Sequence, residues 1–270
     1  MKILFIGDIM GRSGREALEK YLPRLRTELD PDVVIVNGEN AANGAGITEK
    51  ICKEFYDLGV DCITTGNHIW DQREIIPYID RDKKLLRPAN YPEQTPGSGV
   101  LRHKLKDGRT IVVINIMGRL FMNTLDDPFE VMSRILDKEK LGKTADAIFV
   151  DFHGEATSEK MSFGHYYDGR ISAVIGTHTH IPTADTHIMP GGTAYMSDSG
   201  MTGDYDSVIG VEKEIAIHRF ISKMPGERMR PANGSGMLCG AYILTNNKGK
   251  AERIEPVRLG NILTEYMPEA

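Results

Sequence analysis

The chain has 270 residues, of which 40% are hydrophobic and 26% charged, and its formal net charge is −5. These values are typical of a globular protein with enough apolar material for a core, and they argue against a polycationic nucleic-acid binder. The three cysteines form no Cys-x-x-Cys pair, which favours reduced thiols in a cytoplasmic protein. We expect neither a secretory signal nor a membrane partner, because no apolar run approaches the roughly 18 residues that span a bilayer.

The first 80 residues alternate between strand and helix patterns. Three apolar runs are expected to form buried strands, at residues 2–9, 32–37 and 60–65. Each is followed by a segment with helical character, at residues 12–29, 47–59 and 71–79. Thr48 is a favourable N-cap for the second of these helices. The alternation predicts an α/β fold with a mainly parallel, doubly wound sheet.

The rest of the chain is less regular. Residues 87–100 are rich in proline and glycine and are expected to form a loop or an edge. Three further apolar runs predict strands, at residues 110–118, 146–154 and 171–175. From Met237 to about Val257 the pattern is that of a hairpin around an Asn-Asn-Lys-Gly turn. We expect a single domain over residues 1–270, in which a loop and helix at 119–142 could form a small lid.

Residues with metal-binding side chains follow the predicted strands. They are Asp8, Glu39, Asn40, Asn67, His68, His153, His178 and His180. Taken singly, each has an ordinary explanation as a helix cap, a turn residue or a hydrogen-bonded histidine. Taken together, they place carboxylate, amide and imidazole groups at strand ends, which an α/β sheet gathers on one edge. Because these groups are too many for one tetrahedral zinc, the pattern indicates two metal ions that share a bridging carboxylate.

The stretch Gly-Thr-His-Thr-His-Ile-Pro at residues 176–182 contains two histidines one residue apart. In a continuing strand, residues i and i+2 point to the same side, so that His178 and His180 would face one point. The pair alone is compatible with ligands of one ion, ligands of two ions or polar residues at a strand end. If two ions divide the imidazoles, we expect the backbone to turn after Gly176, which lets the two rings diverge.

Two further polar segments have less specific patterns. Residues 197–210 are dense in glycine, serine and aspartate, and they either contact substrate or form a polar surface loop. His165 is expected to lie at a packed helix end rather than in the site.

Five short motifs carry a resemblance to a known family. They are Gly7-Asp8, Gly38-Glu39-Asn40, Gly66-Asn67-His68, His153 and Gly176-Thr-His178-Thr-His180. Together they resemble the motif series of the calcineurin-like metallophosphoesterases. The sequence departs from that series at three positions, which are Met10, Glu39 and Ile69. These departures, with the blocks MKILFIGDIMGRSGR, VNGENAANG and TGNHIWD, are similar to the YmdB-like branch, and the similarity extends over nearly the whole chain.

The resemblance implies a layered fold in which mixed β-sheets are flanked by helices, with the metal site at the C-terminal ends of strands. It implies two metal ions, iron in the first place, with manganese or another divalent metal as the alternative. The implied ligands are Asp8, Asn40 and His180 for one ion, Asn67, His153 and His178 for the other, and Glu39 as the bridge. Met10 is not counted, because a thioether is a poor ligand for a hard cation.

The resemblance also implies hydrolysis of small cyclic nucleotides, expected here to be 2′,3′-cyclic ones. A metal-bound hydroxide would attack phosphorus in line with the leaving oxygen, and His68 would donate the proton to that oxygen, with Asp71 as a weaker candidate. The alternatives are a phosphomonoesterase or nuclease on the same scaffold, and a regulatory or RNA-associated binding protein with a structural metal site. The expected partner is the small substrate; extended nucleic-acid binding is not expected, and a homo-oligomer is left open.

Overall fold

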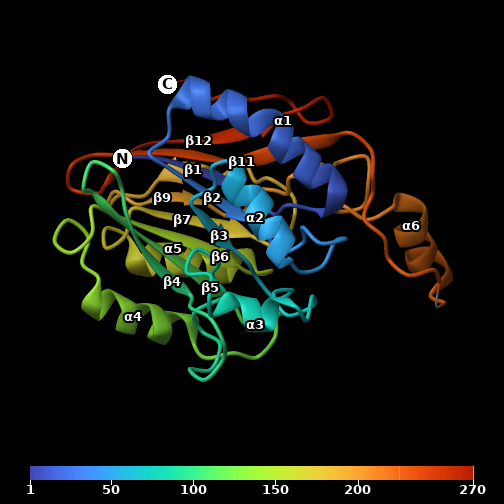
Figure 1. The fold of residues 1–270 in the computed structure, drawn as a ribbon, viewed down its shortest axis with the longest axis horizontal. Helices are drawn as coiled ribbons and strands as arrows, with labels where there is room; N and C mark the ends of the chain where they lie inside the picture. Colours follow the sequence, from blue (N-terminus) through green and yellow to red (C-terminus); the bar gives the residue numbers. More distant parts are fainter. Residues whose placement is uncertain (225, 270) are drawn as a thin grey trace.

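The protein is an α/β sandwich in which two mixed β-sheets are stacked face to face and covered by helices (Figure 1). The structure is a computed structural model that describes residues 1–224 and 226–269. The first sheet has the strand order β10-β11-β1-β2-β3, and β12 also pairs with β11. The second sheet has the order β4-β5-β6-β7-β9-β8.

The first sheet combines the N-terminal strands with the C-terminal hairpin. Its strands are β1 (Lys2–Ile6), β2 (Val33–Asn37), β3 (Cys62–Thr64), β10 (Gly203–Asp204), β11 (Gly236–Thr245) and β12 (Ala251–Leu259). Strands β1, β2 and β3 are parallel, whereas β11 runs antiparallel to both β1 and β12. The predicted hairpin therefore extends the N-terminal β-α-β unit on its β1 side.

The second sheet is built from the middle of the chain. Its strands are β4 (Val100–Lys104), β5 (Thr110–Met117), β6 (Ala147–His153), β7 (Ala173–Thr177), β8 (His187–Ile188) and β9 (Ala194–Met196). Strands β5, β6, β7 and β9 are parallel, and the antiparallel strands β4 and β8 form the two edges.

Helices cover the outer face of each sheet. They are α1 (Gly11–Leu29), α2 (Glu49–Asp57) and α3 (Ile75–Ile79) on the first sheet, and α4 (Pro128–Lys138) and α5 (Thr157–Tyr167) on the second; the sixth helix, α6 (Lys213–Ser222), lies apart from these layers. In β1, Leu4 and Ile6 pack under α1 and α2, whereas Phe5 packs between the sheets, 5.1 Å from Phe149 in ring-centroid distance. Because the parallel strands are buried on both faces, they are largely apolar rather than alternating.

The layered α/β arrangement with mixed sheets is confirmed, but the single doubly wound sheet expected from the alternation of elements is wrong. The strands from residue 100 to residue 196 form a second sheet instead of extending the first. Thr48 caps α2 as predicted, since its Oγ1 accepts a hydrogen bond from the N–H of Ile51 at 3.3 Å. The helix predicted at 71–79 begins only at Ile75, because the preceding residues form turns.

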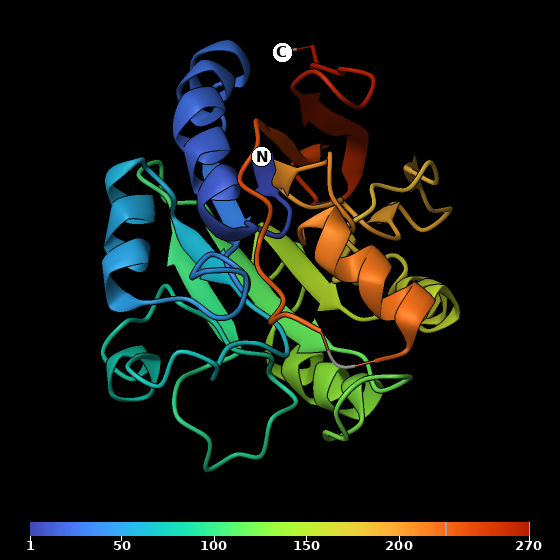
Figure 2. The same cartoon turned by 90° about the vertical axis from the view of Figure 1, so that its right-hand side faces the viewer.

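Helix α6 was not predicted, and it projects from the side of the molecule (Figure 1). Figure 2 shows α6 and α2 on opposite sides of one face, with the chain that follows α6 running between them. Helix α4 lies within the segment 119–142, whose function as a lid stays a prediction. Among residues 1–224 and 226–269, no helix combines the length and the apolar character needed to cross a membrane.

Candidate metal centre

Oxygen donors reach the candidate site from the first sheet. Asp8 follows β1, Glu39 and Asn40 follow β2, and Asn67 follows β3. Because β1, β2 and β3 are parallel neighbours, their C-terminal ends meet at one edge. The carboxylates of Asp8 and Glu39 are both almost fully buried, at 1% exposure.

Imidazoles reach the same place from the second sheet. His153 is the last residue of β6, and His178 and His180 follow β7. In the parallel register of these strands, His153 pairs with Thr177. The ends of two sheets therefore converge on one site, rather than the ends of one sheet as expected from the sequence.

One group of donors surrounds the Nε2 atom of His153. This atom lies 3.2 Å from Glu39 Oε1, 3.0 Å from Asn67 Oδ1 and 3.1 Å from His178 Nδ1. Glu39, His153 and His178 each contribute one ligand atom. These three atoms lie within 4.8 Å of one another, close enough to hold a metal ion. These are the residues that the resemblance assigns to one ion, with Glu39 as the bridge.

A second group surrounds the Nε2 atom of His180. This atom lies 3.5 Å from Asp8 Oδ2 and 3.1 Å from the side-chain amide of Asn40. Asp8, Glu39 and His180 each place one ligand atom within 4.8 Å of the others. The Asn40 amide also lies 3.0 Å from Glu39 Oε1, and a half-turn of this amide exchanges its nitrogen for its oxygen. Glu39 thus belongs to both groups.

The backbone of the Gly176–Pro182 stretch separates the two imidazoles, as expected. Strand β7 ends at Thr177, and His178 and His180 then take left-handed φ angles of 100° and 68°. Such angles are uncommon for residues other than glycine, and they turn the chain so that the two rings belong to different groups. The N–H of His178 donates to Asp8 Oδ2 at 3.0 Å, which links the two groups.

The charges of the site suit bound cations. Burial raises the pKa of Asp8 well above its usual range, and the charge of Glu39 raises it further. The buried Oδ1 of Asp8 has no hydrogen-bond partner among the described residues, which is costly unless a cation satisfies it. Burial lowers the pKa of His178 to about 4 and also lowers the pKa of His180, which favours the neutral imidazole that a metal ligand must present. The donor set therefore fits metal ions.

The comparisons with known proteins show the family of this chain. The sequence profile of the YmdB-like proteins matches residues 4–257. The chain belongs to the YmdB-like family. It is 47% identical to a 2′,3′-cyclic-nucleotide 2′-phosphodiesterase of Bacillus subtilis over 262 residues, which cover 97% of this chain and 98% of that protein.

Two crystal structures are similar to this YmdB-like chain over 96% of its length. One is a hypothetical protein from Thermus thermophilus, with 42% identity, a TM-score of 0.90 and 99% of that chain covered. The other is described as a novel phosphatase of Mycoplasma pneumoniae, with 32% identity, a TM-score of 0.89 and 93% of that chain covered.

A buried relay orients His153 in this YmdB-like site. Thr177 Oγ1 donates to Asp151 Oδ1 at 2.7 Å, so it accepts a hydrogen bond from Nδ1 of His153, 2.8 Å away. With Nδ1 carrying that proton, Nε2 is the nitrogen that faces the donors. Asp151 Oδ2 also accepts from Asn37 and Thr64 of the first sheet, at 2.9 Å and 2.5 Å. The relay thus ties β6 and β7 to the other sheet.

The segment 197–210 supports the two histidines of the β7 turn. Asp198, which is 1% exposed, accepts hydrogen bonds from both the N–H and the hydroxyl of Thr179, at 2.9 Å and 2.8 Å. Buried Lys160 donates to the same carboxylate at 3.0 Å, and His180 Nδ1 donates to the carbonyl of Ile209 at 2.7 Å. Because residues 197–204 are buried, this part of the segment is not a surface loop, and the sequence pattern did not reveal its supporting role. Contact of the segment with substrate stays a prediction.

His68 lies at the border between the donors and an open cleft. Its backbone N–H donates to Glu39 Oε2 at 3.3 Å, and its ring Nδ1 lies 2.7 Å from Asp71 Oδ2. The side chain is 39% exposed, and it lines a cleft of about 920 Å³. His165 is exposed on α5, and the structure does not place it among these donors.

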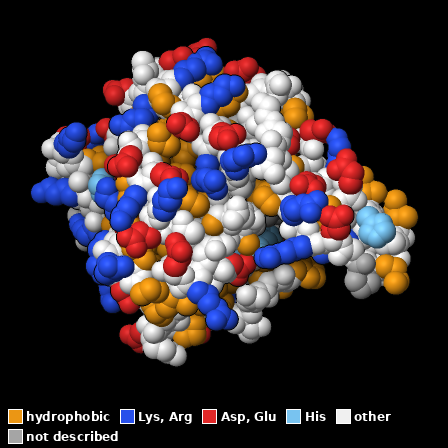
Figure 3. Space-filling view, turned by 45° about the vertical axis from the view of Figure 1, so that its right-hand side comes forward, with side chains coloured by type: hydrophobic (Ala, Val, Ile, Leu, Met, Phe, Trp, Pro, Cys, Tyr) orange, Lys and Arg blue, Asp and Glu red, His pale blue; other side chains and the backbone are white. Residues whose placement is uncertain are grey.

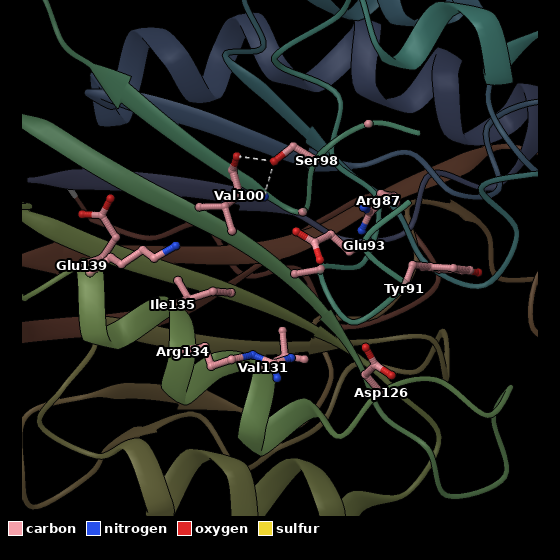
Figure 4. A pocket seen from close by; sticks show the side chains of 14 residues that line it. Arg87, Tyr91, Glu93, Ser98, Val100, Asp126, Val131, Arg134, Ile135 and Glu139 are labelled. Carbon is pink, nitrogen blue, oxygen red and sulfur yellow. Dashed lines mark hydrogen bonds between the residues drawn. The ribbon is translucent and has the colours of Figure 1, made fainter. Parts of the chain in front are cut away.

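A second cavity, of about 810 Å³, lies between α4 and the segment 87–100 (Figure 4). Its described lining contains none of the predicted site residues. Size alone therefore does not single out a functional site in this molecule.

Proposed function

We propose that this YmdB-like protein is a metal-dependent phosphodiesterase that hydrolyses small 2′,3′-cyclic nucleotides. The observation that carries the proposal is the pair of donor groups that share Glu39, with His68 between them and an open cleft. Structural metal sites are usually closed by protein ligands, whereas catalysis needs an accessible position. The name of the Bacillus subtilis relative supports a cyclic nucleotide as the substrate class.

The proposed ligands are Asp8, Asn40 and His180 for one ion, Asn67, His153 and His178 for the other, and Glu39 for both. Two cations bound there would offset the negative charge of a phosphodiester and supply an activated water. We propose iron in the first place and manganese or another divalent metal as the alternative, because mixed oxygen and imidazole donors suit these ions.

His68 is proposed to protonate the leaving oxygen. The contact of its Nδ1 with Asp71 holds the ring in place and leaves Nε2 available to donate a proton. In the overall reaction, the oxygen of water bonds to phosphorus while the bond from phosphorus to the 2′ oxygen breaks. That oxygen takes the proton of His68, and His68 regains a proton from the water.

Hydrolysis of a substrate panel with varied metals tests the proposal. The panel contains 2′,3′-cAMP, 3′,5′-cAMP, a bis-aryl phosphate, a phosphomonoester and a polynucleotide. We expect the highest kcat/KM for 2′,3′-cAMP and two metal ions per chain. A preference for the monoester or the polynucleotide would replace the proposal by a phosphatase or a nuclease. Two bound metals without any phosphoester hydrolysis would favour the regulatory or RNA-associated binding protein.

Single substitutions separate metal binding from proton donation. We expect Asn67→Ala and His178→Ala to lose metal and activity together. His68→Ala should keep both metals and lose activity by about 10²- to 10⁴-fold, the range typical of general acid catalysis. His165→Ala is the matched control, because His165 is an exposed histidine on α5. Full activity of His68→Ala would exclude His68 as the proton donor.

A further inference from the structure

The cleft beside His68 has an uneven distribution of charge. Its described lining contains four arginines and no aspartate or glutamate; the arginines are Arg12, Arg219, Arg228 and Arg230. The chain as a whole carries a net charge of −5, so this positive charge is a local feature. Figure 3 shows Lys and Arg side chains on both sides of the hollow between the main body and the lobe that carries α6.

Two distant parts of the chain build this cleft. One part consists of Arg12 at the start of α1, the loop 42–45 that follows Asn40, and the turn with His68 and Gln72. Gln72 Nε2 donates to the carbonyl of Ala45 at 2.8 Å and so fixes the loop against the turn. The other part is Arg219 of α6 with the chain that follows this helix and crosses the face (Figure 2). The arginines thus line the same cleft as the proposed proton donor.

The arginines differ in the partners that they already have. Arg230 pairs with Glu212 and Glu227, each at 3.0 Å, and Arg12 lies 3.8 Å from Glu16. Within residues 1–224 and 226–269, neither Arg219 nor Arg228 forms an ion pair with a carboxylate. Arg219 Nη2 donates to the backbone carbonyl of Glu227 at 3.1 Å, which leaves its other N–H groups for an anion. The planar fork of an arginine matches the oxygens of a phosphate.

The cavity beside α4 provides a contrast. It is similar in volume, at about 810 Å³, but its charges balance (Figure 4). Three basic residues, Arg87, Arg134 and Lys138, line it together with three acidic residues, Glu93, Asp126 and Glu139. Of these two cavities, only the cleft beside His68 has the charge that favours a ligand with several phosphates.

We propose that the arginine cleft binds a second phosphate of the substrate, attached to the 5′ oxygen of the 2′,3′-cyclic nucleotide. The cleft volume of about 920 Å³ lies near the upper end of the range of roughly 300–1,000 Å³ for small-ligand sites, which leaves room beyond one nucleoside. A 5′ phosphate exists as a terminal monoester or as the internucleotide diester of a short oligoribonucleotide. The inference rests on the proposed function, because His68 marks where the cyclic ester lies.

Kinetics on the metal-loaded full chain test the inference with three substrates. They are 2′,3′-cAMP, the same nucleotide with a 5′-phosphate, and the dinucleotide ApA ending in a 2′,3′-cyclic phosphate. We expect kcat/KM for a substrate with a 5′ phosphate to be at least about tenfold higher than for 2′,3′-cAMP. This is the gain expected from one additional hydrogen bond between a charged arginine and the phosphate. The gain should shrink as salt screens the exposed arginines. A higher kcat/KM with the dinucleotide would identify the ends of oligoribonucleotides as the substrate. A higher kcat/KM with the 5′-monoester alone would identify 5′-phosphorylated nucleotides.

Substitutions at the two arginines without carboxylate partners provide the second test. Arg219→Gln and Arg228→Gln should lower the kcat/KM ratio between extended and simple substrates, and the double variant should bring it close to one. Arg134→Gln, in the balanced cavity, is the matched control and should leave the ratio unchanged. Calorimetric binding adds a measurement without turnover: adenosine 3′,5′-bisphosphate should bind more tightly than adenosine 3′-phosphate, and only while both arginines are present.

Two results would overturn the inference. One is hydrolysis of 2′,3′-cAMP with no gain from either kind of 5′ phosphate. The other is a gain that persists in the Arg219→Gln, Arg228→Gln double variant. Failure of the proposed function is distinguishable from both, because none of the three cyclic nucleotides would then be hydrolysed.

Discussion

The two sheets contribute different chemistry to the candidate metal centre. The first sheet brings oxygen donors, which are Asp8, Glu39, Asn40 and Asn67, and the second brings imidazoles, which are His153, His178 and His180. The first sheet therefore supplies negative charge, and the second supplies neutral nitrogen donors once His153 has lost its proton. Neither sheet holds a complete group, since each group takes Glu39 from one sheet and at least one histidine from the other. The site exists only where the two sheets face each other.

The largest effect is expected from Glu39, the donor common to both groups. Glu39→Gln removes the negative charge that both ions would share. We expect loss of both metals and a fall in phosphodiesterase activity of about a thousandfold, the scale of several kcal/mol of electrostatic stabilisation. Metal analysis of the purified variant measures the loss of metal, and kcat/KM for 2′,3′-cAMP measures the loss of activity. Two metals retained per chain would contradict the shared position of Glu39.

The second prediction compares one donor from each sheet within a single group. Asp8→Asn and His180→Gln should each reduce the metal content from two ions to one and lower activity by about a hundredfold. They should differ in stability. Burial raises the pKa of Asp8, so Asp8→Asn should raise the melting temperature of the EDTA-treated protein, whereas His180→Gln should not. If Asp8→Asn and the parent protein had equal melting temperatures after EDTA treatment, the buried carboxylate of Asp8 would not destabilise the metal-free fold.

The third prediction concerns the relay that orients His153. Thr177→Val removes the hydroxyl that connects Asp151 to His153, while it keeps the shape of the side chain. We expect metal affinity to fall by about 10- to 100-fold, as for other residues that support a ligand. Thr177→Ser restores the hydroxyl and should restore the affinity. Competition titration with Mn²⁺ measures both, and equal affinities of the Val and Ser variants would exclude the relay.

The last prediction concerns stability rather than activity: the free energy of unfolding of the EDTA-treated protein should depend on pH. Burial lowers the pKa of His153, but the charge and hydrogen bond of Glu39 outweigh it and raise this pKa from 6.5 to about 9. Because the pKa of His153 is higher in the folded chain than in the unfolded chain, the proton on its ring stabilises the folded state. This stabilisation is complete below pH 6.5 and is lost as the pH rises through about 9. Between pH 6 and pH 10 we expect the free energy of unfolding to fall by on the order of 2–3 kcal/mol.

Urea denaturation at each pH measures this loss, with His153→Gln as the control that should reduce it. Added Mn²⁺ should weaken or reverse the trend, because metal binding displaces the proton from a ligand and is favoured at higher pH. A constant free energy of unfolding in the EDTA-treated protein would contradict the ion pair between His153 and Glu39 that connects the two sheets.

The donors could be predicted from the sequence because each follows directly on a buried strand. The apolar runs before Asp8, Glu39 and His153 are local patterns, and polar residues at their ends are conspicuous. Their supports could not be predicted. Thr177 and Asp151 are 26 residues apart and Lys160 and Asp198 are 38 apart, and no local pattern relates such pairs. The segment after α6, which contributes to the arginine cleft, lacks a strand or helix signal of its own.

The sequence by itself predicted the candidate donors and their order along the chain, because the strand ends that carry them are set by local hydrophobic patterns. The resemblance to the YmdB-like branch already implied a division of the donors into two groups around Glu39, but only the tertiary structure brings the members of each group together in space. That division depends on two sheets packed through residues such as Phe5 and Phe149. It also depends on the left-handed turns at His178 and His180, which long-range contacts to Asp198 and Ile209 hold in place.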